Sequence, residues 1–121
     1  MQKSIVAEKS YAFAIRIIKA YSYLRKNDKG FVLFGQLLRS GTAIGALTHE
    51  AVQAQSRKDF VNKMNVALKE ANETHYWIRL FHDSGFINDA AFESIGHDCK
   101  ELIGMLVSIV KTTKSTPEPK K

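Results

Sequence analysis

The sequence predicts an all-α fold, arranged as an antiparallel up-down-up-down four-helix bundle, from three observations. The chain has no proline before Pro117, so no proline interrupts a helix over most of its length. Apolar residues recur every three or four positions, which is the helical period. Turn-forming clusters, NDKG at 27–30 and DSG at 83–85, separate long helical segments. Short connections of this kind place consecutive helices antiparallel.

The first helix is expected over residues 4–26. Gly30 follows it at a position where glycine commonly ends a helix. Residues at four-three spacing are expected to face the core, and a few neighbours widen this stripe. The stripe comprises Ala7, Tyr11, Ala14, Ile18 and Tyr21, widened by Phe13, Ile17 and Leu24.

The second helix is expected over residues 32–55, with small side chains along its seam. Glycine inside a helix costs about 1 kcal/mol relative to alanine, yet Gly35, Gly41 and Gly45 all lie in this segment. We expect close packing against a neighbouring helix to compensate. The predicted seam is Leu37, Gly41, Ile44, Thr48 and Ala51.

The third helix is expected over residues 57–83. Ser56 and Asp59 form an S-x-x-D start signal, in which the first side chain accepts a hydrogen bond from the backbone of the second. Gly85 is expected to cap the end. The seam follows strict four-three spacing through Phe60, Met64, Ala67, Ala71, Thr74, Ile78 and Phe81.

The fourth helix is expected over residues 89–112, after an Asn88 cap. The bundle would then form one domain, residues 1–113, and residues 114–121 would form a disordered basic tail. The seam of the fourth helix is Phe92, Ile95, Cys99, Leu102, Leu106 and Ile109.

Extra apolar residues on the last two helices predict a homo-oligomer, because apolar side chains on a second face need a covering subunit. The alternative is a monomer with broad core faces. The second stripes are Val66, Glu70, Glu73, Trp77 and Leu80 on the third helix, and Ile103, Val107 and Val110 on the fourth.

Composition favours a soluble cytoplasmic protein. No apolar run approaches the roughly 20 residues that span a membrane, and the amino terminus lacks the pattern of a secretory signal. Cys99 is the only cysteine, so it has no internal disulfide partner. Its apolar neighbours predict a buried side chain.

No pattern of catalytic or metal-binding residues stands out, and we expect neither an enzyme nor a cofactor. Glu70 is followed three residues later by Glu73 and not by histidine, so the Glu-x-x-His spacing of carboxylate metal sites is missing. GTAIGA at 41–46 lacks the strand and the lysine of a phosphate-binding loop. Glu50 and Glu70 are expected to pair with Arg39, Lys69 or a backbone group.

Positive charge is concentrated in the first half of the chain. The net charge is +6, and residues 1–58 carry ten Lys or Arg against three acids. Repeated cations of this kind suit the phosphate backbone of nucleic acid. The sequence predicts two basic clusters, which antiparallel topology would place at opposite ends of the bundle. The first cluster comprises Arg16, Lys19, Arg25, Lys26 and Lys29, and the second comprises Arg57 and Lys58.

Three segments in order, RSGTAIGALTHEA at 39–51, SRKDFVNKMNVALKEANETHYWIRL at 56–80 and SGFI at 84–87, resemble a bacterial family. Its members are known as four helix bundle proteins or 23S ribosomal RNA intervening-sequence proteins. The resemblance implies a homopentamer around a central channel. A relative by fold, the accessory protein of diversity-generating retroelements, binds nucleic acid and a reverse transcriptase.

The family name refers to the genomic location of the genes and not to an activity, so no residue is carried over as catalytic. Distinctive positions are expected to serve packing and pairing between helices: Arg39, Gly41, Gly45, Glu50, Phe60, Glu70, Glu73 and Trp77.

Two functions are compatible with the sequence. The first is binding of RNA or DNA through the basic clusters, as an oligomer that can also engage a nucleic-acid-processing protein. The second is a protein-interaction scaffold without a nucleic-acid role.

Overall fold

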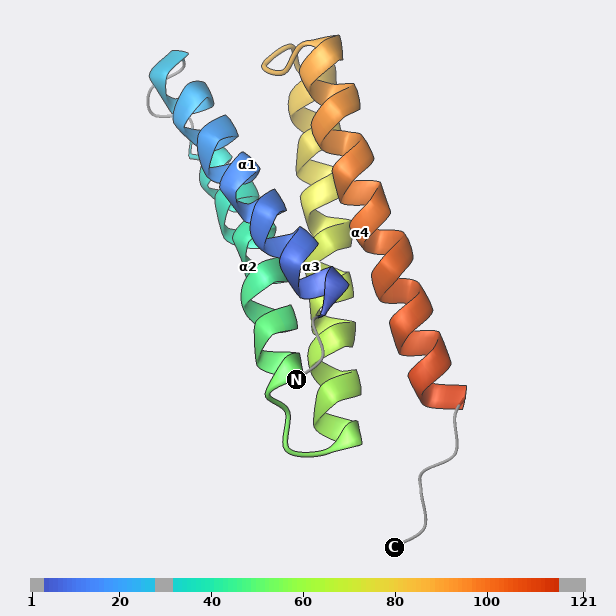
Figure 1. Cartoon of the computed structure of the whole chain (residues 1–121). Coiled ribbons are helices and arrows are strands. Elements are labelled where there is room, and N and C mark those ends of the chain that lie inside the picture. Colours follow the sequence, from blue (N-terminus) through green and yellow to red (C-terminus); the bar gives the residue numbers. More distant parts are fainter. Residues whose placement is uncertain (1–3, 28–31, 116–121) are drawn as a thin grey trace, which may run out of the picture.

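The structure is a computed structural model that describes residues 4–27 and 32–115. These residues form four α-helices and no strand. Figure 1 shows the helices running alternately in opposite directions, so the predicted all-α antiparallel four-helix bundle is confirmed. The helices are α1 (Ile5–Asn27), α2 (Phe34–Val52), α3 (Arg57–Asp83) and α4 (Asp89–Ser115).

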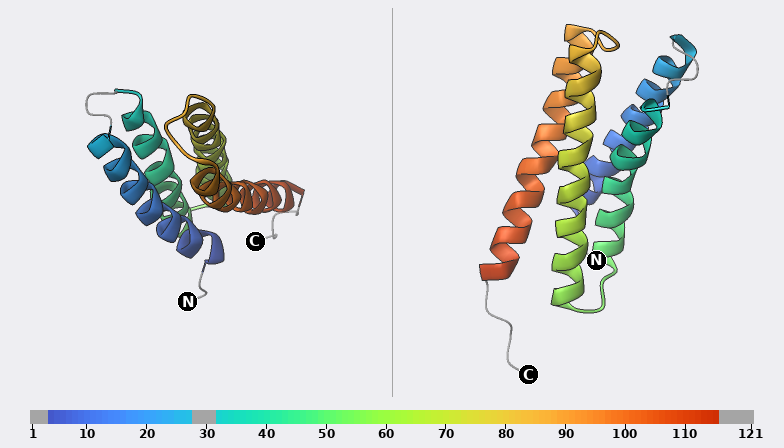
Figure 2. Two further views of the ribbon diagram at one scale, coloured as in Figure 1. Left: turned by 90° about the horizontal axis from the view of Figure 1, so that it is seen from above. Right: turned by 180° about the vertical axis from the view of Figure 1, so that it is seen from behind.

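Helices that follow one another in the chain pack side by side: α1 on α2, α2 on α3, and α3 on α4. The contact between α1 and α4 is much smaller, and Figure 2 shows the α1–α2 and α3–α4 hairpins diverging toward one end. We call this the upper end, as in Figure 1; α1 and α3 finish there. At the lower end α2 and α4 finish. The bundle is therefore partly open along its α1–α4 side.

The ends of α3 and α4 follow from local chemistry. Ser56 Oγ accepts a hydrogen bond from the Asp59 backbone N–H at 3.1 Å, and Asn88 Oδ1 accepts one from the Ala91 N–H at 2.8 Å. Gly85 has φ +89°, a left-handed conformation that other residues rarely adopt, and the Phe86 N–H then bonds back to the Phe81 carbonyl at 2.8 Å. The caps predicted at Ser56, Gly85 and Asn88 are confirmed.

The seams predicted for α2, α3 and α4 face the core. All five predicted residues of α2 are buried, as are Met64 to Phe81 of the α3 seam, while Phe60 is half-buried. In α4 the central part of the seam, Cys99, Leu102 and Leu106, is buried and the outer parts are half-buried. A strict four-three spacing thus identified the core face wherever a helix carries one dominant stripe.

The seam predicted for α1 was wrong in its central residues. Tyr11 is 62% exposed and Ile18 is 52% exposed, whereas Ser10 is fully buried. Ser10 Oγ lies 3.0 Å from Thr48 Oγ1 of α2, so its polar group is satisfied inside the core. The residues of α1 that face the core are Val6, Ala7, Ser10, Phe13, Ile17 and Leu24.

Two glycines of α2 allow the close approach of α1, as predicted. A Cβ on Gly41 would lie 2.8 Å from two carbons of the Ile17 side chain, and one on Gly45 would lie 3.3 Å from the Ser10 carbonyl oxygen. Gly35 has no such neighbour within 4 Å, so close packing does not explain that glycine. On its other side α2 contacts α3, where Thr74 Oγ1 donates to Ser40 Oγ at 2.9 Å.

Two helix boundaries differ from the prediction. α2 is shorter than 32–55, and α4 continues to Ser115, so Lys114 belongs to a helix and not to a tail. The remainder of the predicted tail, together with Lys29 and Gly30, lies outside the described residues. Among the helices of residues 4–27 and 32–115, none is long and apolar enough to cross a membrane.

Candidate nucleic-acid interface

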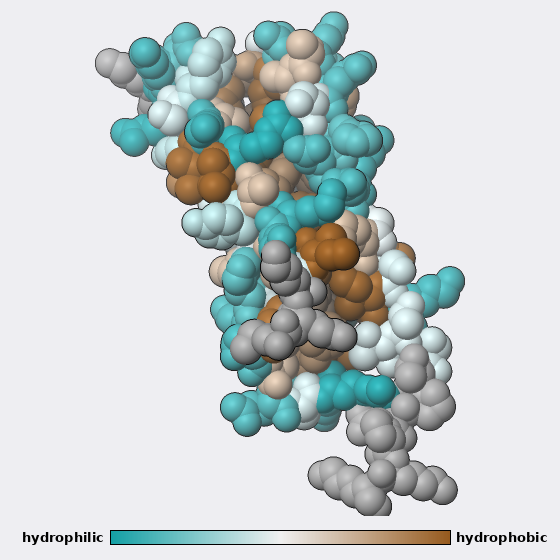
Figure 3. Space-filling model, viewed as in Figure 1, coloured by the Kyte–Doolittle hydropathy of each residue, from teal (hydrophilic) through white to brown (hydrophobic). Residues whose placement is uncertain are grey.

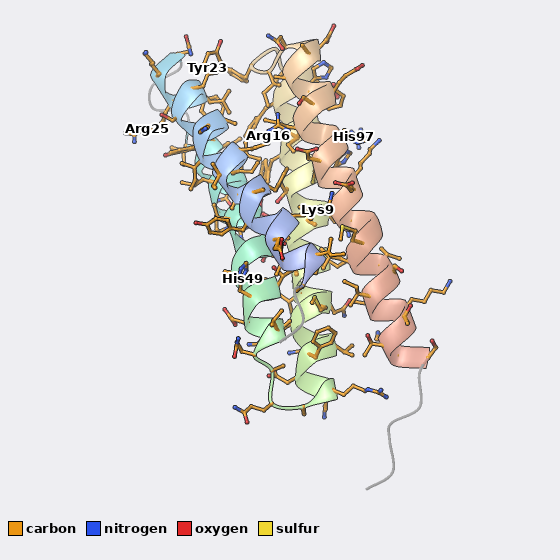
Figure 4. All side chains as sticks on the ribbon, in the orientation of Figure 1. Lys9, Arg16, Tyr23, Arg25, His49 and His97 are labelled. Atoms are coloured by element: carbon orange, nitrogen blue, oxygen red, sulfur yellow. The ribbon has the colours of Figure 1, made fainter. Side chains whose placement is uncertain are left out.

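The upper basic cluster comes from the last three turns of α1. Lys19, Arg25 and Lys26 are exposed and have no ion-pair partner within residues 4–27 and 32–115. Figure 4 shows Arg25 projecting away from the bundle. Lys29, which the sequence assigned to the same cluster, lies outside the described residues. Three predicted cations are thus free to meet a ligand.

Arg16 has a different role from its neighbours. Its guanidinium donates to the Asp98 carboxylate and to Ser94 Oγ at 2.8 Å, both on α4. Lys9 forms a second bridge between the same two helices, to Glu101 at 3.2 Å. Figure 4 shows Arg16 in the space between α1 and α4. Arg16 therefore links helices, and its charge is largely offset by Asp98.

A stripe along one face of α1 combines cations with an exposed aromatic ring. Arg16, Lys19, Tyr23 and Lys26 are spaced by three, four and three residues, which places them on one side of the helix. Tyr23 is 64% exposed. Sequence reasoning counted the cations but missed the tyrosine, although its spacing from Lys19 and Lys26 was readable.

A groove opens beside this stripe at the upper end. It has a volume of about 810 Å³ and lies between α1 and the segment that joins α3 to α4. Figure 3 shows a hollow between the two hairpins at this end of the molecule. Its walls are formed by Arg16, Lys19, Ala20, Tyr23, Leu24, Gly85, Phe86, Ile87, Asn88, Ala91 and Ile95.

The lower basic cluster lies where α3 begins and α4 ends. Arg57, Lys58 and Lys114 line a groove of about 760 Å³ together with polar side chains that include Asn62 and Thr113. Because Lys114 was predicted to lie in a tail, sequence reasoning did not place it here. Because α3 and α4 are antiparallel, the end of α4 lies beside the start of α3, and this topology could have placed Lys114 at the lower end.

The two clusters lie at opposite ends of the bundle, as the topology predicted. α3 has 27 residues and connects the two ends, so about 40 Å separates them along its axis. The structure does not bring the six described residues of the predicted binding set into one patch. The two ends are therefore separate candidate sites.

Several acidic residues are already paired with cations elsewhere in the bundle. Arg39 on α2 donates to Glu70 at 3.1 Å and to Glu73, both on α3. Trp77 Nε1–H donates to the same Glu73 carboxylate at 3.0 Å. The predicted pairing of Glu70 with Arg39 is confirmed. These four residues form a polar link between α2 and α3.

This link changes the proton affinities of its members. The hydrogen bond from Trp77, together with that from Arg39, lowers the pKa of Glu73, while the hydrogen bond to Glu73 raises the pKa of Arg39. Both groups are therefore charged at neutral pH. Their opposite charges therefore offset one another within the link.

Glu50 and Phe60, two other positions predicted to serve pairing or packing, do not belong to this link. Glu50 is exposed and pairs with Lys63 of α3 at 3.2 Å, not with Arg39, Lys69 or a backbone group. Being exposed, it does not need a buried partner. Phe60 is half-buried and packs against the core.

Three other side chains, Cys99, His82 and His75, have pKa values that their surroundings shift. Burial raises the pKa of the Cys99 thiol to about 12, and its Sγ lies 3.4 Å from the Ala71 carbonyl oxygen. The hydrogen bond to Asp89, with a second to Asp83, raises the pKa of His82, which stacks on Phe92. Burial, with nearby Lys100 and Arg79, lowers the pKa of His75.

Within the described part of the chain, no three His, Cys, Asp or Glu side chains converge as metal ligands would. The two grooves are instead lined by cations, amides and hydroxyls, together with Asp59 in the lower groove and with Tyr23 and apolar side chains in the upper one. This chemistry is suited to holding an anion or a polyanion.

Comparisons with known proteins agree with the fold. Comparison with curated proteins finds no match. The structure is similar to that of a protein of unknown function from the S23 ribosomal protein family of Bacteroides thetaiotaomicron. The two chains are 50% identical and superpose with a TM-score of 0.86, over 88% of this chain and 99% of the other.

The family profile described as 23S rRNA-intervening sequence protein matches residues 2–108. This range includes α1, α2, α3 and most of α4. It also includes the glycines that contact α1 and the polar link around Arg39. The resemblance noted in the sequence is thus confirmed over nearly the whole chain, and the protein belongs to the 23S rRNA-intervening sequence protein family.

Proposed function

We propose that this protein is a non-enzymatic nucleic-acid-binding protein that holds the phosphate backbone of RNA or DNA at the two ends of its bundle. The observation that carries the proposal is that four exposed cations at these ends have no acidic partner within the described residues, whereas Glu70, Glu73, Asp98 and Glu101 along the sides are paired with cations. Lys19, Arg25 and Lys26 are free at the upper end, and Lys58 is free at the lower end.

Free lysines support phosphate binding for a physical reason. A polyanion that meets an unpaired lysine releases condensed counterions, and this release is favourable at low salt. A lysine already paired with a carboxylate gains much less. The lower groove adds hydroxyl and amide donors from Thr113, Asn62 and Asn65, which can bond to phosphate oxygens.

Charge reversal at each end tests the proposal. We expect Lys19→Glu with Lys26→Glu, and separately Lys58→Glu with Lys114→Glu, to weaken binding of a fluorescent oligonucleotide about tenfold per lysine at about 0.1 M salt. Each lysine lost should also reduce the salt slope by about 1. Fluorescence anisotropy with RNA and DNA of one sequence measures both quantities.

The matched control is Lys69→Glu with Lys100→Glu, which changes the net charge equally but lies on exposed positions away from both ends. Equal weakening by this control would mean that total charge, and not the two clusters, governs binding. Wild-type affinity that stayed constant between about 50 and 200 mM salt would overturn the proposal. The scaffold function would then be the better one.

We propose in addition that the protein acts as a homo-oligomer, for which the family resemblance suggests five copies. An exposed apolar face on α1 supports this. Tyr11, Ile15 and Ile18 lie on one side of the helix and are 62%, 42% and 52% exposed. An apolar face of this kind on a soluble protein commonly marks an interface between proteins.

Light scattering tests the oligomer. We expect wild-type protein to have a multiple of the 13.6 kDa chain mass, and Ile15→Lys with Ile18→Lys to reduce it because two charges would enter the interface. Ile5→Lys is the control, since Ile5 is 65% exposed and lies on another side of α1. A wild-type particle of 13.6 kDa at micromolar concentration would contradict the proposal.

A further inference from the structure

We propose that the upper groove accepts an unstacked nucleobase, so that the protein prefers single-stranded to duplex nucleic acid. This inference rests on the proposed function and names its substrate class. It is drawn from the shape of the groove, from Tyr23 on its rim, and from the lysines on either side of that ring.

The groove has the chemistry of a pocket for a flat, largely apolar group. Leu24, Phe86 and Ile95 provide apolar walls, while Lys19 and Asn88 supply polar groups at the same site. A volume of about 810 Å³ lies within the range of about 300–1,000 Å³ that small-molecule pockets occupy. The Asn88 side chain also caps α4 through Oδ1, which leaves its NH₂ group available as a donor.

The walls of the groove are held in place by contacts outside it. Phe86 packs edge-to-face on Phe34 of α2, with ring centroids 5.3 Å apart. The bridge from Arg16 to Asp98 and Ser94 joins α1 to α4 beside the groove. These contacts link both walls to the bundle, so a ligand would meet a largely formed site and lose little binding energy to reorganisation.

Tyr23 and its neighbours match the way in which proteins bind single strands. Such proteins combine cations that follow the backbone with aromatic rings on which bases stack. Lys19 precedes Tyr23 by four residues and Lys26 follows it by three, so a cation lies about one turn to either side of the ring. A strand along this face could place phosphates on both lysines and a base on Tyr23 or in the groove.

A duplex cannot use this arrangement without unpairing, because its bases are stacked inside the helix and extruding one costs a few kcal/mol. The lower groove offers no comparable selectivity, since none of the described residues that line it is aromatic. The upper end would therefore distinguish single strands from duplexes, while the lower end would bind the backbone of either.

The test compares a mixed-sequence 20-nucleotide strand with its own duplex, in RNA and in DNA, at one salt concentration. We expect wild-type protein to bind the single strand about 10- to 100-fold more tightly, which is the range that one or two stacked bases provide. Tyr23→Ala should remove most of this preference and leave duplex affinity unchanged, whereas Tyr23→Phe should retain it because the ring remains.

Two further variants test whether the preference for single strands depends on the groove and on Tyr23 in particular. Ala91→Leu fills part of the groove from α4 without altering Tyr23, adding a ring or changing a charge, and it should also abolish the preference. Tyr76→Ala is the control, because Tyr76 is 55% exposed on α3 and does not line the groove. Circular dichroism verifies that each variant is folded.

The outcomes separate this inference from the proposed function. Equal wild-type affinity for strand and duplex, or equal weakening of both by Tyr23→Ala, would overturn the inference while backbone binding stands. A preference that survives Ala91→Leu would mean that the groove does not hold the base, and would also overturn it. No binding of any oligonucleotide would overturn both proposals.

Discussion

Gly41→Ala is expected to lower the free energy of unfolding by about 1–3 kcal/mol, although alanine is the better helix former. The added Cβ would lie 2.8 Å from both Cγ1 and Cγ2 of Ile17, closer than carbon atoms pack. Ile17 is fully buried, so its side chain has no free space to move into. Either α1 must move away from α2, or Ile17 must leave its preferred rotamer. Urea denaturation followed by circular dichroism measures the loss.

Gly104→Ala is the matched control for this prediction. Gly104 lies inside α4, is exposed, and has no atom within 4 Å of the position that a Cβ would occupy. The same substitution should therefore stabilise the protein by up to about 1 kcal/mol, through helix propensity alone. If both variants shifted stability in the same direction, close packing would not be the reason for glycine at position 41.

Phe34→Ala is expected to have the larger effect, a loss of about 3–5 kcal/mol. Phe34 is fully buried at the start of α2, and its ring meets those of Phe81 and Phe86 edge-to-face at 5.1 and 5.3 Å. These contacts join α2 to the end of α3 and to the segment before α4. Truncation leaves a cavity at the upper end and removes the support behind one wall of the groove.

Phe60→Ala tests whether this cost depends on burial. Phe60 is only half-buried at the opposite end of α3, so its truncation should cost less than half as much. Denaturation is followed at one protein concentration, because unfolding of an oligomer depends on concentration. A loss at Phe34 no larger than that at Phe60 would contradict the expectation that the cost of truncation depends on the burial of the ring.

The core faces of α2, α3 and α4 were readable from sequence because the strict four-three stripe of each helix faces the core, although α3 and α4 also carry a second stripe. α1 has apolar residues on both its core face and an exposed face, and spacing alone does not say which of the two faces the core. Aromatic and aliphatic residues made the stripe through Tyr11 and Ile18 look stronger. The core face instead includes Ser10, a polar residue whose hydroxyl is satisfied there by the Val6 carbonyl oxygen of the same helix and by Thr48 of α2. Thr48 lies 38 residues further along the chain, so nothing in the local sequence indicates this contact.

The candidate interface was predictable only in part, for a similar reason. The positions of the two basic clusters follow from topology, since turns of an antiparallel bundle alternate between its ends. Whether each cation has an acidic partner does not follow from topology. Arg16 and Lys19 look alike in sequence, yet Arg16 is paired with Asp98, 82 residues away, and Lys19 has no partner within the described residues. Only the three-dimensional structure distinguishes the paired Arg16 from Lys19.

The limited contact between α1 and α4 also affects how the chain folds. Nearly all tertiary contacts join helices that are consecutive in sequence. Each pairing therefore closes only a short loop, and the entropy lost in closing it is small. Chains with such local topology fold on the microsecond to millisecond scale. The α1–α2 hairpin can form during synthesis before α4 has emerged, and the pairing of the first helix with the last is left as the final step.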